Sequence, residues 1–273
     1  MVVESNIIGE LLGAAPVFLL IAVRALAMIE TAPLLSSESI PQAAKISLAG
    51  FAAYLAFPTA LAADWDASYF SLAFVFFIAG EAIIGIILGF YLTIIFSAFS
   101  TAGQFFSLQM GFGASETFDP LSQVENPLMG QYLNLVAMLV FLVMGGFREL
   151  FLGGFWRSIE SINILNLVAG REAAVKMLLA GLSRLFLDAI IISLPILGTL
   201  FLTSLTTGLI SKAAPQINIL SEGFPISITV AFLLIAATMP FMVEAFGRVI
   251  DAGWRAIETL YIDLGGRIQG AAL

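Results

Sequence analysis

The sequence contains neither cysteine nor histidine, and each absence excludes several kinds of chemistry. Without cysteine, the chain of 273 residues forms no disulfide, thiolate nucleophile, iron–sulfur cluster or cysteine-held zinc site. Without histidine, it lacks the commonest general base and the commonest side-chain ligand for metals and haem. Neither a phosphate-binding Walker loop nor a Gly-x-Gly-x-x-Gly motif occurs. We therefore expect a protein that is not an enzyme and that binds no cofactor or metal.

Charged residues are scarce as well. They make up 11% of the chain, against 60% hydrophobic residues, and the mean hydropathy is +1.04. Soluble domains carry about 25% charged residues, because polar side chains must cover their apolar interior. The net charge of −8 also argues against a nucleic acid partner, which needs a basic face. No linker rich in proline, serine or charge divides the chain, so we predict a single membrane-embedded domain covering residues 1–273.

Long apolar stretches follow one another along the chain. A helix needs about 20 apolar residues to cross a hydrocarbon core of about 30 Å, because unpaired backbone groups cannot face lipid. The third stretch is too long for one straight span, so it must kink, tilt or protrude. We predict an all-α membrane protein of about six long, partly kinked helices. The stretches cover residues 7–29, 46–63, 69 to beyond 107, 127–147, 177–210 and 224–243.

A few ionisable residues stand inside these stretches: Arg24, Glu81, Arg184 and Asp188. Each costs about 2.5–3.5 kcal/mol at the centre of a membrane helix, so each needs a partner or a function. Arg184 and Asp188 are four residues apart and can neutralise each other on one helix face. Glu81 has no such partner in its own stretch. It forms a salt bridge to another helix, lies near the water boundary, or belongs to a proton or ion relay.

Two pairs of glycines have the spacing that lets helices approach closely. Gly9 and Gly13 form one pair, and Gly85 and Gly89 form the other. A Gly-x-x-x-Gly pair removes two side chains from one helix face, so another backbone can lie against it. Either pair could therefore mark a helix–helix contact.

The segment 213–225 joins the last two stretches and is bounded by two prolines. We expect Pro225 to begin the last helix in its first turn, where the missing N–H matters least, and Gly223 to form a tight turn before it. The segment is either a solvated loop or a docking site for a partner. Its candidate residues are Pro215, Gln216, Asn218, Glu222, Gly223, Phe224 and Pro225.

Several motifs together resemble a known family. The most specific block is Ala214-Pro215-Gln216-Ile217-Asn218-Ile219 followed by Gly223-Phe224-Pro225. Others are Arg24, Pro33, Ile40-Pro41 and Lys45; Gly80-Glu81 with Gly85 and Gly89; Gln109-Met110-Gly111 with Phe118-Asp119-Pro120; and Gly130-Gln131-Tyr132-Leu133-Asn134. In this order, over nearly the whole chain, they resemble the FliR family, the R-type subunits of the type III protein-export gates of flagella and injectisomes. Glu222 departs from the resemblance, because a small or apolar residue is expected there.

The resemblance implies a function and a set of partners. It implies one R-type subunit in a complex with P-type and Q-type subunits in the bacterial inner membrane, within the flagellar basal body. Further membrane proteins of the export apparatus would also be partners. The gate would pass unfolded flagellar export substrates, and part of it would be raised above the bilayer. Residues 1–175 would be P-like and residues 176–273 a Q-like helical hairpin and tail, with its tip toward the cytoplasm. One alternative is a secondary transporter for a small solute with Glu81 and Asp188 as coupling groups. Another is a structural assembly factor with no role in the pore, which differs only in whether the 110–127 loop touches substrate.

With this resemblance, the segment from Met110 to Glu125 is a candidate plug of the export pore. Its glycines permit unusual backbone conformations, its bulky apolar residues suit a seal, and its acids would be tolerable only in a wet lumen. An ordinary acidic loop fits the same residues. The candidate plug residues are Met110, Gly111, Phe112, Gly113, Glu116, Phe118, Asp119 and Pro120.

Overall fold

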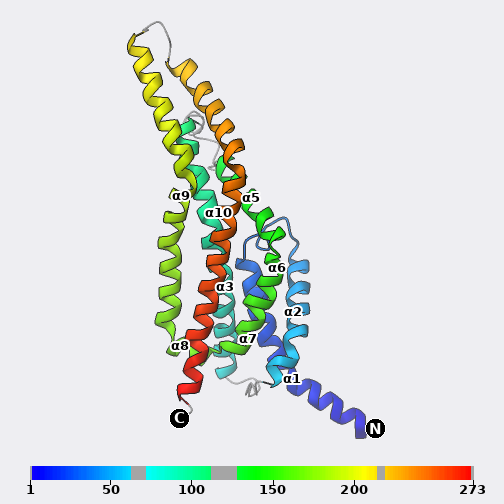
Figure 1. Ribbon diagram of the computed structural model, residues 1–273. Coiled ribbons are helices and arrows are strands. Elements are labelled where there is room, and N and C mark those ends of the chain that lie inside the picture. Colours follow the sequence, from blue (N-terminus) through cyan, green and yellow to red (C-terminus); the bar gives the residue numbers. More distant parts are fainter. Residues whose placement is uncertain (1, 63–71, 112–127, 214–218, 272–273) are drawn as a thin grey trace. The chain divides into compact units, whose positions relative to one another are not determined.

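In the computed structural model, the described residues are 2–62, 72–111, 128–213 and 219–271, and nearly all of them are helical (Figure 1). Side chains are described for residues 15–61, 74–111, 128–213 and 223–265. The prediction of an all-α membrane protein is confirmed. The elements are α1 (Val2–Thr31), α2 (Gln42–Ala62), α3 (Leu72–Met110), α5 (Leu128–Val143), α6 (Gly146–Arg148), the π-helix η1 (Glu149–Trp156), α7 (Arg157–Ser161), α8 (Ile164–Ala169), α9 (Arg171–Ala213) and α10 (Ile219–Ala271).

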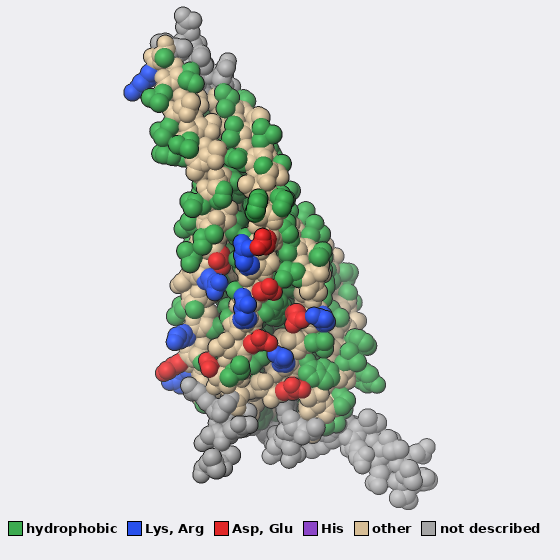
Figure 2. Space-filling model, viewed as in Figure 1, with side chains coloured by type: hydrophobic (Ala, Val, Ile, Leu, Met, Phe, Trp, Pro, Cys, Tyr) green, Lys and Arg blue, Asp and Glu red, His purple; other side chains and the backbone are tan. Residues whose placement is uncertain are grey.

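Four helices in the described part of the chain are long and apolar enough to cross a membrane, namely α2, α3, α9 and α10. A fifth span is present if α5 and the helical segment 146–161 count together, although they are bent by 75°. Large apolar side chains are exposed over much of the face in Figure 2. Because exposing so much apolar surface to water is unfavourable, lipid or partner subunits must cover it.

The long third stretch forms one continuous helix, α3, of 39 residues. At a rise of 1.5 Å per residue, α3 is about 58 Å long, roughly twice the hydrocarbon thickness. It therefore tilts strongly or extends beyond the bilayer, as its length predicted.

The chain consists of two compact units. The first consists of Met1–Thr93, Gly145–Gly181 and Ala252–Leu273, and the second of Ile94–Met144 and Leu182–Asp251. The chain crosses between the units within α3, α9 and α10, and between Met144 and Gly145. The predicted division into a P-like part (1–175) and a Q-like part (176–273) concerns likeness to other subunits, and it stays a prediction.

The segment 148–176, which lies between two of the predicted apolar stretches, is largely helical. Gly145 has φ +75°, a left-handed conformation that glycine adopts easily, and it separates α5 from α6. The π-helix η1 follows directly and contains Gly153 and Gly154. Asn163 then caps α8, since its side chain accepts a hydrogen bond from the Asn166 backbone N–H at 2.8 Å.

The expected start of the last helix at Pro225 is wrong. Helix α10 begins at Ile219, so Gly223 and Pro225 lie inside it. A proline removes one backbone hydrogen bond from a helix, and long membrane helices tolerate that loss. Helix α10 has 53 residues and also includes Pro240, so no single proline ends it.

Candidate functional site

A buried polar network surrounds Arg24 on α1, in the first unit. Arg24 is 0% exposed, and its guanidinium donates to the carboxylate of Glu81 on α3. It also donates to Ser158 Oγ at 3.1 Å and to the Ile162 carbonyl oxygen at 2.9 Å. Glu81 itself is 3% exposed. A buried charge is tolerated when it is paired and hydrogen-bonded, so the interhelical salt bridge predicted as one role of Glu81 is confirmed.

The π-helix beside Arg24 supplies further acceptors to this network. The Ser158 hydroxyl donates to the Phe155 carbonyl at 2.6 Å, and the buried Tyr261 of α10 donates to the Gly154 carbonyl at 2.6 Å. Short π-helical segments often occur at functional sites. Here, the last turn of η1 presents two carbonyls to side chains of α7 and α10. The sequence carried no signal for this arrangement beyond the two glycines.

Helices α1 and α3 pack backbone to backbone next to the network. A Cβ atom built on Gly85 would overlap the Arg24 carbonyl oxygen and lie 2.9 Å from the Ala27 Cβ. One built on Gly89 would overlap the Thr31 side chain. The predicted helix contact at the Gly85–Gly89 pair is confirmed, because no side chain fits there. The surroundings of Gly9 and Gly13 lie outside the described residues.

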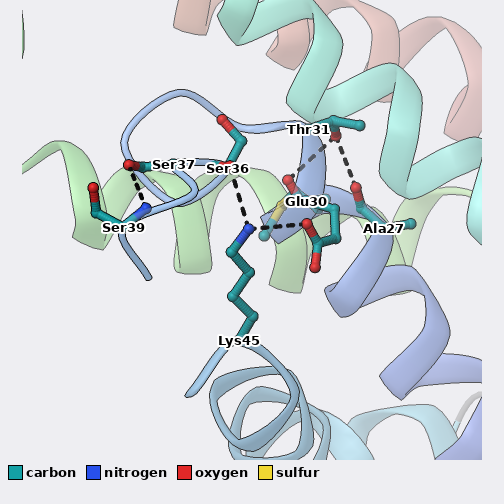
Figure 3. A network of polar contacts seen from close by, with 8 residues as sticks. Ala27, Glu30, Thr31, Ser36, Ser37, Ser39 and Lys45 are labelled. Carbon is teal, nitrogen blue, oxygen red and sulfur yellow. Dashed lines mark hydrogen bonds and ion pairs between the residues drawn. The ribbon is translucent and has the colours of Figure 1, made fainter. Parts of the chain in front are cut away.

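A second buried cation fixes the turn between α1 and α2 (Figure 3). Lys45 is 4% exposed, and its Nζ donates to Glu30 Oε2 at 3.0 Å and to the Ser36 carbonyl at 3.2 Å. The turn contains Leu34 at φ 71°, a conformation that a bulky residue resists. The sequence showed Lys45 only as a motif residue, because its partner Glu30 belongs to another helix.

The remaining predicted charges pair within one helix. Arg184 and Asp188 on α9 lie 3.4 Å apart, and Asp188 is 14% exposed. Asp188 belongs to the second unit, whereas Glu81 belongs to the first and is bound to Arg24. Neither observation supports the transporter alternative. Within the described ranges, no three or more Asp and Glu side chains are grouped so that they could hold a metal ion.

The structure describes the candidate plug only at residues 110 and 111, and the hairpin segment only at its two ends. Met110 is fully buried at the end of α3, and Gly111 follows with φ +90°. A Cβ atom on Gly111 would overlap the ring of Phe224 on α10 and lie 3.3 Å from its Cγ, so these two predicted residues are in contact. Outside the described residues lie Phe112, Gly113, Glu116, Phe118, Asp119, Pro120, Pro215, Gln216, Asn218 and the side chain of Glu222.

Comparison with known proteins gives consistent matches over most of the chain. The family model for bacterial export proteins, family 1, matches residues 15–253. The flagellar biosynthetic protein FliR of Escherichia coli (strain K12) is 33% identical over 230 residues, which cover 80% of this chain and 82% of that protein. FliR of Bacillus subtilis (strain 168) is 30% identical over 229 residues, covering 82% and 86%. The surface presentation of antigens protein SpaR of Shigella sonnei is 31% identical over 155 residues, covering 56% and 57%.

Proposed function

Since the chain belongs to family 1 of the bacterial export proteins, we propose that it is the R-type subunit of a flagellar, type III protein-export gate in the bacterial inner membrane. In this role it forms part of the channel for unfolded export substrates and catalyses no reaction. The observation that carries the proposal is its similarity to FliR over 80% or more of the chain in two distant bacteria. The flagellar relatives are matched over more of the chain than the SpaR protein, which favours a flagellar gate.

The surface of the protein supports assembly with other membrane subunits of the P and Q type. Leu202 and Leu209 on α9 are exposed, as is Phe241 on α10. Three residues beyond Phe241, the exposed ion pair Glu244–Arg248 begins, with side chains 70% and 64% exposed. Ionic side chains facing lipid are unfavourable, so this part of α10 meets water or a polar protein surface. This agrees with a subunit that is partly raised above the bilayer.

The segment 110–125 acts as the plug of the gate in this proposal. Its described base supports that role, because Met110 is buried in the core and Gly111 follows the end of α3 in a left-handed conformation.

Co-expression with tagged P-type and Q-type subunits tests the proposed function. The expected result is one complex whose mass, measured under native conditions, contains this chain. The chain expressed alone should aggregate or be degraded, because its apolar surface then lacks partners. A monodisperse, long-lived monomer that transports a small solute in liposomes would contradict the proposal.

A further inference from the structure

Helices α9 and α10 each contain a proline deep inside the helix, at a similar distance from the hairpin segment. Pro195 lies about five turns before Ala213, where α9 ends, and Pro240 lies about six turns after Ile219, where α10 begins. Neither proline has an N–H for the carbonyl oxygen four residues before it, so each helix lacks one backbone hydrogen bond there. Sharp bends in long helices occur mostly at such residues. Both prolines belong to the second unit.

Threonines close to the two prolines weaken the same turns further. The Thr199 hydroxyl donates to the Pro195 carbonyl oxygen at 2.9 Å, and the Thr238 hydroxyl donates to the Leu234 carbonyl oxygen at 2.7 Å. A hydroxyl that binds the carbonyl four residues before it slightly destabilises a helix and often bends it. A Cβ atom built on Gly198 would meet nothing within 4 Å, so packing within this chain does not require that glycine. Features that favour bending therefore accompany both prolines.

The part of the hairpin between the two prolines is loosely packed within this chain. We call it the outer arm, and it comprises residues 196–213 of α9 and 219–239 of α10. Leu200 is the last buried residue of α9, because none of residues 201–213 is buried. The buried side chains described on the α10 part are Ser227, Ala231 and Ile235. A segment with few buried apolar contacts moves at a low cost in free energy.

The rest of the second unit is packed more tightly. The rings of Phe99 on α3 and Phe246 on α10 are fully buried, with their centroids 4.6 Å apart. A Cβ atom built on Gly103 of α3 would lie 2.6 Å from the Gly130 Cα of α5, so these two helices are in backbone contact. Neither α5 nor the part of α3 in this unit contains a proline. Helices α3 and α5 therefore form a firm support for the outer arm.

Two weak contacts join the outer arm to the end of α3. The Gln109 amide donates to Ser204 Oγ on α9 at 3.4 Å, which is long for a hydrogen bond, and this contact is exposed. The ring of Phe224 on α10 lies against Gly111. Both contacts are between uncharged groups, so a movement of the outer arm can break and remake them.

We propose that the outer arm pivots at Pro195 and Pro240, and that export requires this motion. This proposal rests on the export function proposed above. The pivot leaves the packing of α3 on α5 intact and separates Phe224 from Gly111 of the candidate plug. Hinge motions of this kind use a few residues that absorb the change in backbone angles, while the parts on either side keep their structure.

Spin-label distances measure the pivot without altering the prolines. The chain has no cysteine, so labels can be attached to introduced cysteines. One pair joins Leu209 on the outer arm to Leu139 on α5, and the comparison pair joins Leu194, just before Pro195, to Leu139. The side chains at 209, 139 and 194 are 68%, 54% and 59% exposed. In the assembled gate complex, the first pair should give a broad distance distribution and the comparison pair a narrow one.

Replacing both prolines tests the hinge together with its function. The double variant P195A/P240A restores two backbone N–H groups, and both positions are exposed, so the complex should form at the wild-type level. The distribution between positions 209 and 139 should narrow to the width of the comparison pair, and most export of flagellar substrates should be lost. The control P58A removes an exposed proline from inside α2, in the first unit, and should change neither measurement.

Three results would overturn the proposal. Equal widths for the two label pairs in the wild-type complex would show that the outer arm does not pivot. A distribution that stays broad in P195A/P240A would place the motion away from the prolines, and wild-type export with a narrowed distribution would show that export does not need it. If the double variant fails to assemble, the wild-type widths still decide whether the arm pivots. A wild-type chain that forms no complex with export subunits would instead contradict the proposed function, and the label widths in the purified chain would then test the pivot.

Discussion

Gly85 and Gly50 illustrate how differently two glycines in apolar helices can behave. Gly85 lies directly against the backbone of α1, whereas a Cβ atom on Gly50 of α2 would meet nothing within 4 Å. In the first case the missing side chain permits a helix contact. In the second case, the missing side chain only gives the unfolded chain more backbone freedom. The same residue type therefore has opposite effects, which depend on its neighbour in space.

We expect Gly85→Ala to destabilise the protein and Gly50→Ala to stabilise it slightly. The methyl group at position 85 forces α1 and α3 apart, and overpacking of this kind costs about 1–3 kcal/mol. At position 50, alanine should add about 0.5–1 kcal/mol, because glycine is the poorer helix former. Denaturant titration in detergent micelles measures both changes. Equal effects at the two positions would contradict the close α1–α3 packing.

Two connections between helices carry the candidate function: the one that follows α3 and the one that joins α9 to α10. The residues next to these connections are packed against other parts of the chain. Met110 is buried at the end of α3, and Gly111 packs against Phe224 near the start of α10. The left-handed conformation at Gly111 favours glycine, since other residues resist it. The base of the candidate plug is therefore held in contact with the hairpin helix.

Deleting residues Gly113 to Phe118 should make the assembled gate leak ions or small solutes. The deletion removes the bulky apolar residues of the candidate plug and keeps Met110, Gly111 and the flanking helices. The complex should therefore still form, which co-purification checks. Conductance of the complex in planar bilayers measures the leak. If the deleted gate assembles and its conductance stays at the wild-type background, the segment is not the plug.

Photo-crosslinkers at positions 218 and 222 should capture another subunit of the export apparatus. Position 218 lies between α9 and α10, and position 222 lies in the first turn of α10. Asn218 and Glu222 supply polar groups suited to a protein partner. Mass spectrometry of the crosslinked product identifies the captured chain. A crosslinker at Leu179, which is exposed on α9 far from this segment in sequence, serves as the comparison. Capture of lipid alone at both hairpin positions would count against docking.

At the scale of the whole molecule, the membrane cannot cover every exposed surface. Helix α10 begins with an apolar half and continues into a half with charged side chains at 244, 248, 251, 255 and 258. These positions follow one another at intervals of three and four, so they line one side of the helix. Such a side is unfavourable against hydrocarbon, so we expect it to meet water or a polar protein surface.

Cysteine labelling in membrane vesicles should reveal this division. A cysteine replacing Glu258 should react with a water-soluble maleimide, whereas one replacing Leu233 should not. Leu233 is 67% exposed in the chain, yet lipid or an apolar partner should cover it. Detergent-denatured samples control for the intrinsic reactivity of each cysteine. Equal labelling of the two positions in intact vesicles would contradict this placement of α10.

The amino-acid sequence alone determined the properties that depend on local composition. Hydropathy predicted the helices and the membrane class, because each apolar stretch must satisfy its backbone hydrogen bonds internally. Spacing along one helix predicted the Arg184–Asp188 pair, because residues four apart meet whatever the rest of the chain does. The sequence did not correctly predict where α10 begins, because a proline inside a long helix removes only one backbone hydrogen bond and need not end the helix.

Only the tertiary structure decided which distant residues meet. The partner of Glu81 lies 57 residues away on α1, and the carboxylate partner of Lys45, Glu30, lies before the turn that precedes α2. Tyr261 reaches a carbonyl 107 residues away, which the π-helix presents to it. Buried polar groups must find partners, but the need for a partner does not identify it. That identity depends on how the helices pack, and in this protein packing depends on two glycines that admit a backbone where other residues would exclude it.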